Sequence, residues 1–124
     1  MAGRDVPVLL EVNVAGEASK TGFAPEALLE AARTIALMPH LRPEGLMTVA
    51  PMAQDAETVR PIFARLRTLR ELLRREAPLA DASGGWRELS MGMSDDFEAA
   101  IAEGATLVRL GRILFGERPA AGAR

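Results

Sequence analysis

A stretch near the end of the chain concentrates small, hydroxylated and basic side chains: Leu89–Arg118, LSMGMSDDFEAAIAEGATLVRLGRILFGER. Gly92 and Gly111 have no side chain, so backbone N–H groups beside them can approach a ligand closely. Ser90 and Ser94 add hydroxyl donors, and a predicted helix start follows each glycine turn. These are the components of a site for an anion or a phosphate group. The pattern is equally typical of turn glycines and a serine helix cap, and both interpretations stay open.

Arg109 is the one charged residue of an otherwise apolar predicted strand, Ala105–Leu110 (ATLVRL). It lies at the carboxyl end of that strand, on the same face as Leu107. A guanidinium fixed there can meet an acceptor atom on a ligand, or it can pair with a carboxylate at the sheet rim. Gly111 then begins a turn into a short predicted helix, Ile113–Gly116.

The elements that must position these residues alternate along the whole chain. The predicted strands are Val6–Val14, a run from about Gly45 within Leu41–Ala50, Arg87–Ser90 and Ala105–Leu110. The predicted helices are Pro25–Met38, a long helix from an Asp55 cap to about Ala77, a helix from a Ser94 cap to Gly104, and Ile113–Gly116. This order predicts an α/β fold with parallel strands and right-handed crossovers. Four such units form a small open sheet or half of a TIM-type eight-stranded barrel, where loops after the last two strands often hold phosphate.

Three further groups of residues are given structural interpretations. Glu11 and Asn13 share one face of the first predicted strand, opposite Leu10 and Val12, which places polar groups at its carboxyl end. A run of arginines on the long predicted helix could bind a polyanion, but interleaved glutamates favour a solvated face; the arginines are Arg65, Arg67, Arg70, Arg74 and Arg75. Five methionines are interpreted as core or site-wall residues: Met38, Met47, Met52, Met91 and Met93.

The composition excludes several classes of function. The 124 residues contain 15 Lys and Arg against 17 Asp and Glu, so the net charge of −2 gives no basic footprint for nucleic acid. Cys is absent and a single His is present, which removes disulfides, thiolate chemistry and multi-histidine metal sites. The apolar runs are far shorter than the ~20 residues that span a bilayer. No signal peptide is recognised, so a cytoplasmic location without membrane contact is expected.

At this point the motifs carry a resemblance. The segment Leu89–Ser94 (LSMGMS), with the later AI, VR and IFG elements, resembles the signature of the YggS-type pyridoxal-phosphate homeostasis proteins. Glu11–Asn13 (EVN), Glu17–Gly22 (EASKTG) and Gly45–Met47 (GLM) resemble further segments of that family. The resemblance covers nearly the whole chain. It implies the barrel fold of the alanine racemase N-terminal domain, pyridoxal 5′-phosphate (PLP) as cofactor, and a role in PLP homeostasis without an established turnover.

The same resemblance implies roles for individual residues. Ser90 would hydrogen-bond the PLP phosphate, and Gly111 and Arg112 would offer backbone N–H groups to it. Arg109 would point at the pyridine nitrogen, where a neighbouring cation disfavours protonation of the ring. An unprotonated ring is a weaker electron sink, which suits a carrier better than a carbanion-forming catalyst. Lys20 matches a loop lysine near the mouth of the site, and it equally fits a solvated loop charge.

The chain departs from the family pattern in ways that shape the expectation. Arg112 stands where the family usually has Thr, and Glu11 where it has Gln. The family's Schiff-base lysine and the GEN motif of the next strand have no match, and Lys20 is the only lysine. Residues 1–118 are therefore expected to be the C-terminal half of the barrel, with residues 119–124 as a flexible tail.

These departures define the expected function and its alternatives. PLP is expected to bind non-covalently at most, in a protein that is not an enzyme. The alternative is a half-barrel interaction module that pairs with a second copy or with a separate N-terminal half. A racemase fragment is disfavoured because the chain ends at the eighth strand and leaves no second domain.

Overall fold

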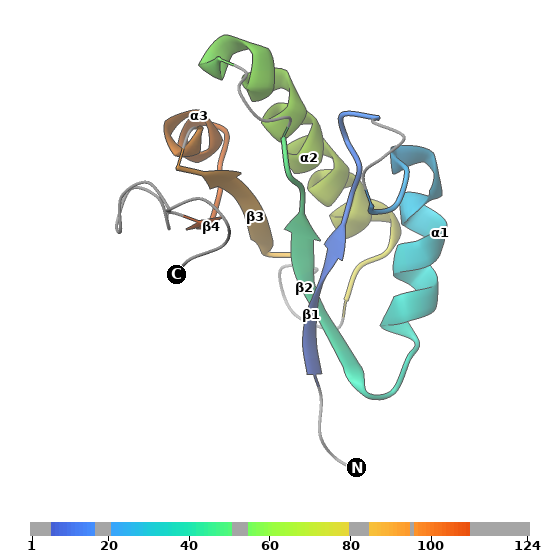
Figure 1. The fold of residues 1–124 in the computed structure, drawn as a ribbon. Coiled ribbons are helices and arrows are strands. Elements are labelled where there is room, and N and C mark those ends of the chain that lie inside the picture. Colours follow the sequence, from blue (N-terminus) through green and yellow to red (C-terminus); the bar gives the residue numbers. More distant parts are fainter. Residues whose placement is uncertain (1–5, 17–20, 51–54, 80–84, 95, 110–124) are drawn as a thin grey trace, which may run out of the picture.

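The computed structural model describes residues 6–16, 21–50, 55–79, 85–94 and 96–109, arranged as strands alternating with helices (Figure 1). The strands are β1 (Val6–Glu11), β2 (Leu41–Met47), β3 (Glu88–Met93) and β4 (Leu107–Arg109). The helices are α1 (Pro25–Ala36), α2 (Ala56–Glu76) and α3 (Phe97–Ala102). The strands form one parallel sheet in the order β1-β2-β3-β4. The expectation of an α/β fold with parallel strands is confirmed.

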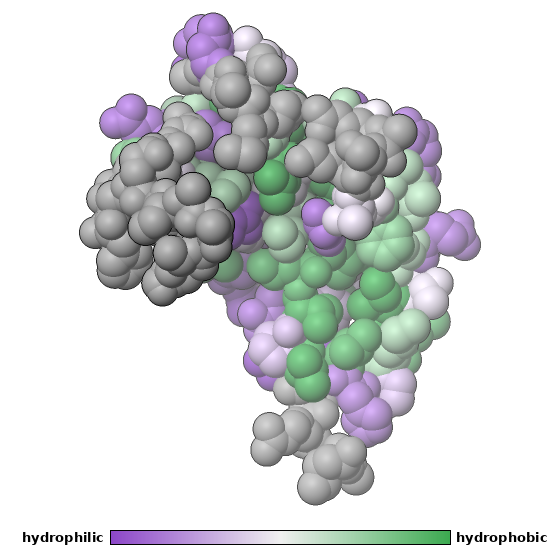
Figure 2. Space-filling model, in the orientation of Figure 1, coloured by the Kyte–Doolittle hydropathy of each residue, from purple (hydrophilic) through white to green (hydrophobic). Residues whose placement is uncertain are grey.

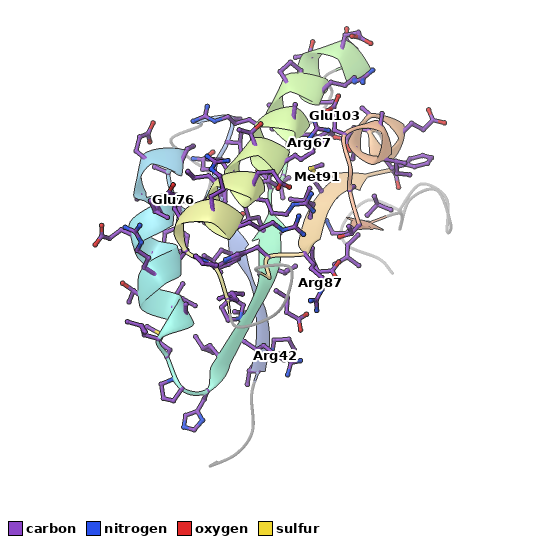
Figure 3. All side chains as sticks on the ribbon, turned by 180° about the vertical axis from the view of Figure 1, so that it is seen from behind. Arg42, Arg67, Glu76, Arg87, Met91 and Glu103 are labelled. Atoms are coloured by element: carbon purple, nitrogen blue, oxygen red, sulfur yellow. The ribbon has the colours of Figure 1, made fainter. Side chains whose placement is uncertain are left out.

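The two long helices pack against one face of the sheet. Viewed from behind, α1 and α2 lie in front of the strands, whereas in Figure 1 they lie beyond them (Figure 3). Strand side chains that face these helices are buried, including Leu10, Leu46 and Leu89. They form one core with the apolar stripe of α2, which consists of Val59, Phe63, Leu66, Leu69 and Leu73.

The opposite face of the sheet carries no helix among the described elements. We call it the helix-free face, and it carries Leu9, Glu11, Met47, Ser90 and Leu107, whose side chains alternate with the core residues. Hydrophobic side chains gather on this face over β1 and β2 (Figure 2). Leu107 keeps 46% of its surface exposed, and Val6 keeps 47%.

Both long helices begin where the sequence predicts. Pro25 is at the start of α1, where its missing N–H costs no helical hydrogen bond. Asp55 caps α2, because its Oδ1 accepts the backbone N–H of Thr58 at 2.8 Å. Hydrogen bonds with Thr58, first that of its side chain and then that of its backbone, hold the pKa of Asp55 below its usual range.

The strand bounds differ from the sequence expectation. β2 begins at Leu41 rather than near Gly45, because β1 pairs with it from Val6 onward. Tertiary pairing thus overrides the poor strand propensity of Pro43 and Gly45. Gly45 is required there, since a Cβ would lie 2.0 Å from the Glu88 carbonyl oxygen. β3 runs on to Met93, so the prediction that it ends at Ser90 is wrong.

The start of α3 also differs from the expectation. Ser94 was expected to cap this helix, but the helix begins at Phe97 and the capping position is Asp96. The Asp96 carboxylate instead accepts the backbone N–H of Met93 at 2.7 Å, which closes the turn after β3. The helix ends before Gly104, at φ 101°, as predicted. The predicted helix Ile113–Gly116 and tail 119–124 lie outside the described residues.

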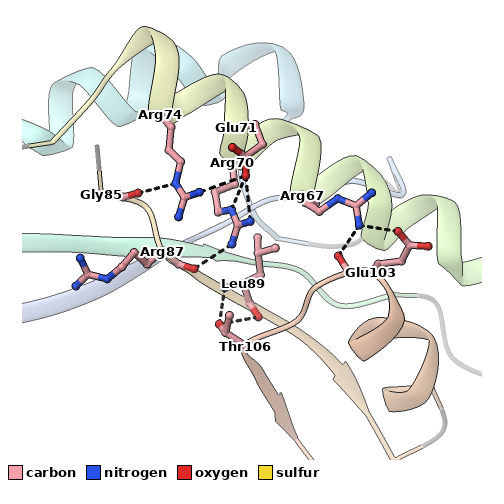
Figure 4. A network of polar contacts seen from close by, with 9 residues as sticks. All are labelled: Arg67, Arg70, Glu71, Arg74, Gly85, Arg87, Leu89, Glu103 and Thr106. Atoms are coloured by element: carbon pink, nitrogen blue, oxygen red, sulfur yellow. Dashed lines mark hydrogen bonds and ion pairs between the residues drawn. The ribbon is translucent and has the colours of Figure 1, made fainter. Parts of the chain in front are cut away.

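Arginines of α2 hold the last part of the sheet in place. Arg60 and Arg67 form ion pairs of 2.9 and 3.0 Å with Glu103, which follows α3. Arg70 and Arg74 donate to the carbonyls of Arg87 and Gly85, just before β3 (Figure 4). The expectation of a solvated face is wrong for Arg67, Arg70 and Arg74, which together with Arg60 connect α2 to the segments that carry β3 and β4.

The methionines divide between core and surface. Met91 is fully buried and Met47 is half-buried, as expected. Met38 and Met93 are each 42% exposed, so the core interpretation is wrong for these two. Met52 lies outside the described residues.

Candidate functional site

The carboxyl ends of the four strands meet at one end of the sheet, because the strands are parallel. Four polar residues lie at or near this end: Asn13 after β1, Thr48 after β2, Ser90 in the middle of β3 but level with the last residue of β2, and Arg109 at the last described position of β4. Three of them are joined by hydrogen bonds, and Asn13 belongs to a separate turn.

Ser90 lies within β3 and faces away from the helices. Its neighbours Leu89 and Met91 are fully buried on the helix side, so the alternation of a strand places Ser90 on the helix-free face. It is 5% exposed and pairs in register with Met47 and Leu107. The sequence expectation placed Ser90 at the strand end, but three more residues of β3 follow it.

Arg109 reaches back across the sheet from β4. Its Nη1 donates to the Ser90 hydroxyl at 3.1 Å, and its Nη2 donates to the Thr48 carbonyl at 3.2 Å. Among the described residues its hydrogen-bond partners are thus a hydroxyl and a carbonyl, and no carboxylate pairs with it. These bonds use two of the five N–H donors of a guanidinium. A half-buried cation therefore lies beside a hydroxyl, which is a suitable donor set for an anionic or basic acceptor.

Thr48 joins the other three strands and was not singled out from the sequence. It is 1% exposed, and its hydroxyl donates to the Val12 carbonyl at 2.6 Å. Its N–H donates to the Ser90 carbonyl at 3.1 Å, and its own carbonyl accepts from Arg109. The available signal was one hydroxyl in the apolar run that follows Gly45. A buried hydroxyl in such a run must find an acceptor.

Glu11 and Asn13 organise the loop after β1. The Glu11 carboxylate accepts from the Thr21 hydroxyl at 3.1 Å, and the Asn13 side-chain oxygen accepts the N–H of Gly16 at 3.2 Å. Glu11 pairs with Met47, which pairs with Ser90, so Glu11 and Ser90 are two strand spacings apart, roughly 10 Å. Glu11 therefore does not join the Ser90–Arg109 pair directly.

Gly92 has a packing role. It adopts φ 102°, and a Cβ there would lie 2.6 Å from the Ala100 Cβ and 3.3 Å from Val108 Cγ1. The residue thus allows α3 and β4 to approach β3 closely. The turn-glycine and phosphate-approach interpretations both placed Gly92 outside the strand, and β3 includes it.

The remaining expected site residues cannot be placed. Gly111, Arg112 and Lys20 lie outside the described residues. Within the described ranges, no group of His, Cys, Asp or Glu is arranged to hold a metal ion. The described helices include none with the length and apolarity needed to cross a membrane.

Two hollows lie near the sheet. One of about 350 Å³ is lined by Asn13, Gly16, Gly22, Pro25 and Arg65, among others, beside the start of α1. The other, of about 280 Å³, lies on the helix-free face and is lined by Pro7, Val8, Leu9, Glu44, Glu88 and Leu107. Neither lining includes Ser90 or Arg109, so the polar cluster is a separate feature at the carboxyl ends of the strands.

Comparison with protein families gives a match over most of the chain. Residues 1–119 match the family described as alanine racemase, N-terminal domain. The chain is 50% identical over 111 residues to a pyridoxal phosphate homeostasis protein of Aquifex aeolicus, covering 90% of this chain and 46% of that protein. A protein of the same name from Pseudomonas aeruginosa is 49% identical over 111 residues, covering 90% and 44%.

Solved structures of other proteins also superpose on the fold of this chain. A protein of unknown function from Bifidobacterium adolescentis superposes with a TM-score of 0.78 at 41% identity, covering 87% of this chain and 42% of that one. PipY of Synechococcus elongatus with PLP bound superposes with a TM-score of 0.70 at 31% identity, covering 87% and 48%. The chain thus spans about half the length of the relatives that it matches.

Proposed function

Because the chain belongs to the alanine racemase N-terminal domain family, we propose that it is part of a PLP-binding homeostasis protein and that Ser90 and Arg109 contact the cofactor. The relatives at 49–50% identity bear the name pyridoxal phosphate homeostasis protein, and PipY has been crystallised with PLP. The observation that carries the proposal is the contact of 3.1 Å between Arg109, the last residue of β4, and the Ser90 hydroxyl in β3.

The donor set fits the two polar ends of PLP. A serine hydroxyl donates to a phosphate oxygen, and a guanidinium donates to a phosphate or to an unprotonated ring nitrogen. Arg109 is the last residue of β4, and Ser90 is level with the last residue of β2, so both lie toward the side of the sheet where α/β barrels bind phosphate. We assign Ser90 to the phosphate and Arg109 to the ring nitrogen. Backbone N–H groups of Gly111 and Arg112 complete the proposed phosphate contacts.

The position proposed for Arg109 also favours carriage of PLP over catalysis with PLP. When bound, PLP supplies an electrophilic aldehyde and a ring that withdraws electrons when its nitrogen is protonated. A fixed cation beside that nitrogen lowers the pKa of the ring nitrogen and keeps it unprotonated. The proposed role is therefore carriage of PLP, consistent with relatives named for homeostasis.

We further propose that the four βα units form one half of an eight-stranded barrel. The parallel sheet has its helices on one face, as in a barrel wall. Leu9 and Met47 are half-buried and Leu107 is 46% exposed on the face that a barrel would enclose. Residues 1–118 would be this half, and residues 119–124 a tail.

The second candidate is an interaction module that associates with another copy or with a separate polypeptide supplying the other half. The observation that favours it is the same apolar surface on the helix-free face (Figure 2). The two candidates make different predictions for ligand binding, since only the first requires PLP to bind at Arg109.

Calorimetric titration of the 124-residue chain with PLP, pyridoxal and inorganic phosphate tests the proposal. We expect PLP to bind more tightly than either part alone, and borohydride treatment to leave no pyridoxyl group on the protein. A matched variant, Lys20→Arg, should bind PLP as the wild type does. Tight binding with reduction onto Lys20 would contradict non-covalent carriage, and no binding of PLP would favour the interaction module.

A further inference from the structure

Thr48 is a buried threonine that contacts both residues of the proposed site. Its N–H donates to the Ser90 carbonyl at 3.1 Å, and its carbonyl accepts from Arg109 Nη2 at 3.2 Å. Its hydroxyl donates to the Val12 carbonyl at 2.6 Å, and 1% of the residue is exposed. One residue after β2 thus connects the ends of β1 and β4 with the middle of β3.

We propose that Thr48 is a positioning residue, whose hydroxyl fixes the carbonyl that orients the Arg109 guanidinium toward the ring of a bound PLP. This inference rests on the proposed function and names a residue on which that function depends. Thr48 itself need not touch the ligand.

The reasoning starts from the flexibility of the arginine. An arginine side chain has several rotatable bonds, and a ligand that needs one orientation gains from groups that fix it beforehand. Two described groups fix Arg109: the Ser90 hydroxyl and the Thr48 carbonyl. Because Ser90 is assigned to the phosphate, the Thr48 carbonyl is the contact that stays constant when a phosphate approaches the serine.

The Thr48 carbonyl is itself fixed by the hydroxyl. The peptide that joins Met47 to Thr48 pairs on both sides, with the Val12 N–H and with the Ser90 carbonyl, whereas the Thr48 carbonyl belongs to the next peptide, beyond the end of β2. The short bond from Oγ1 to Val12 anchors the residue to β1, and the N–H bond to Ser90 anchors it to β3. Without the hydroxyl, the peptide before Thr48 stays paired with Val12 and Ser90, but no described bond other than that from Arg109 holds the peptide after it, so the Thr48 carbonyl can turn away from Arg109.

The test replaces Thr48 with residues of matched shape or matched chemistry. Thr48→Val keeps the β-branched shape and removes the hydroxyl, whereas Thr48→Ser keeps the hydroxyl. The control is Trp86→Phe, which removes a different buried side-chain donor: the Trp86 Nε1–H bonded to the Ala77 carbonyl at 2.8 Å. Trp86 precedes β3 and so lies at the opposite end of the sheet from Arg109.

Two measurements separate positioning from simple destabilisation. The first is PLP affinity with the absorption spectrum of bound PLP, which reports the protonation of its ring. The second needs no ligand and is the NMR signal of the Arg109 guanidinium, assigned with Arg109→Lys. Thermal unfolding of every variant confirms that it is folded.

We expect Thr48→Val to weaken PLP binding about fivefold, the equivalent of one ordinary hydrogen bond. Its bound-PLP spectrum should shift, its Arg109 signal should broaden, and its affinity for inorganic phosphate should stay unchanged. Thr48→Ser should restore wild-type values, and Trp86→Phe should keep the wild-type spectrum and signal. A folded Thr48→Val with wild-type spectrum and Arg109 signal would overturn the inference. If the wild type does not bind PLP but Thr48→Val still releases Arg109, the proposed function fails and the positioning role stands.

Discussion

The Arg109 guanidinium donates to the Ser90 hydroxyl at 3.1 Å, although 19 positions separate the two residues in the chain. β3 and β4 are adjacent parallel strands, and α3 forms the crossover between them. The contact therefore depends on how α3 returns the chain to the sheet, which makes it sensitive to the residues that fix this crossover.

The two members of this contact should differ in the part of PLP that they recognise. Ser90→Ala removes a hydroxyl donor to a charged phosphate, so we expect PLP and inorganic phosphate to bind about tenfold more weakly or worse. Arg109→Leu should weaken PLP binding comparably and alter the spectrum of bound PLP while affecting phosphate less. Calorimetry and absorbance measure both effects. Equal binding by both variants and the wild type would place the site elsewhere.

Gly92→Ala should destabilise the protein by roughly 2–3 kcal/mol, because it combines an unfavourable φ with a collision. The new Cβ would lie 2.6 Å from the Ala100 Cβ. The control is Gly16→Ala, where φ is 78° but nothing lies within 4 Å, so only the conformational cost of about 1 kcal/mol applies. Chemical denaturation gives both values, and equal losses in the two variants would contradict the packing role of Gly92.

Glu103 is expected to be the ion-pair partner that matters most for the crossover. Its side chain is 13% exposed and pairs with Arg60 and Arg67, so Glu103→Gln should cost about 1–3 kcal/mol. Glu71→Gln is the control, because Glu71 is 45% exposed and exposed pairs contribute about 0–1 kcal/mol. Unfolding in urea would show the difference, and a larger loss for Glu71→Gln would contradict it.

The Asp55 cap predicts a specific pH dependence. Its pKa is lowered in the folded state by the hydrogen bonds to Thr58, so the carboxylate stabilises the fold above its ordinary titration range. That contribution is lost as the pH falls through the lowered folded-state pKa. Asp55→Asn keeps a capping acceptor but does not titrate. The stability difference between wild type and D55N should therefore shrink as the pH falls below about 4, as measured by thermal unfolding. A difference that stays constant through acid would show that the cap does not titrate.

The exposed apolar side chains predict association of the 124-residue chain. An apolar area of several hundred Å² is unusual on a monomer, so we expect dimers or larger species in light scattering after size-exclusion chromatography. Leu107→Glu should shift the population toward monomer. Leu37→Glu changes a residue that is 84% exposed at the end of α1 and should leave the distribution unchanged. A cooperative wild-type monomer at high concentration would show that the four-stranded sheet and its helices are self-sufficient.

Periodicity predicted the elements of this fold well and the site less completely. The stripe of α2 and its Asp55 cap depend on neighbours in sequence, so both were recognisable. The extent of β2 and β3 depends on partners far along the chain. In β2, the low strand propensity of Pro43 and Gly45 also argued against the observed start. Ser90 and Arg109 stood out by type and motif, whereas Thr48 gains its role only from contacts made 36 and 61 positions away.

The loop after β1 also shapes the outer edge of the sheet. Phe23 accepts from the Asn13 N–H and donates to the Glu11 carbonyl, each within 2.9 Å, so it occupies the carboxyl half of that edge. The N–H groups of Val6 and Val12 donate to carbonyls on the β2 side of β1. The backbone nitrogen of Pro7 lies on the opposite, open side and carries no N–H to donate. Among the described residues of this edge, a short stretch around Leu9 is left for pairing with another strand. Along its described length this edge therefore offers few free N–H donors, which limits the pairing that another strand can make there.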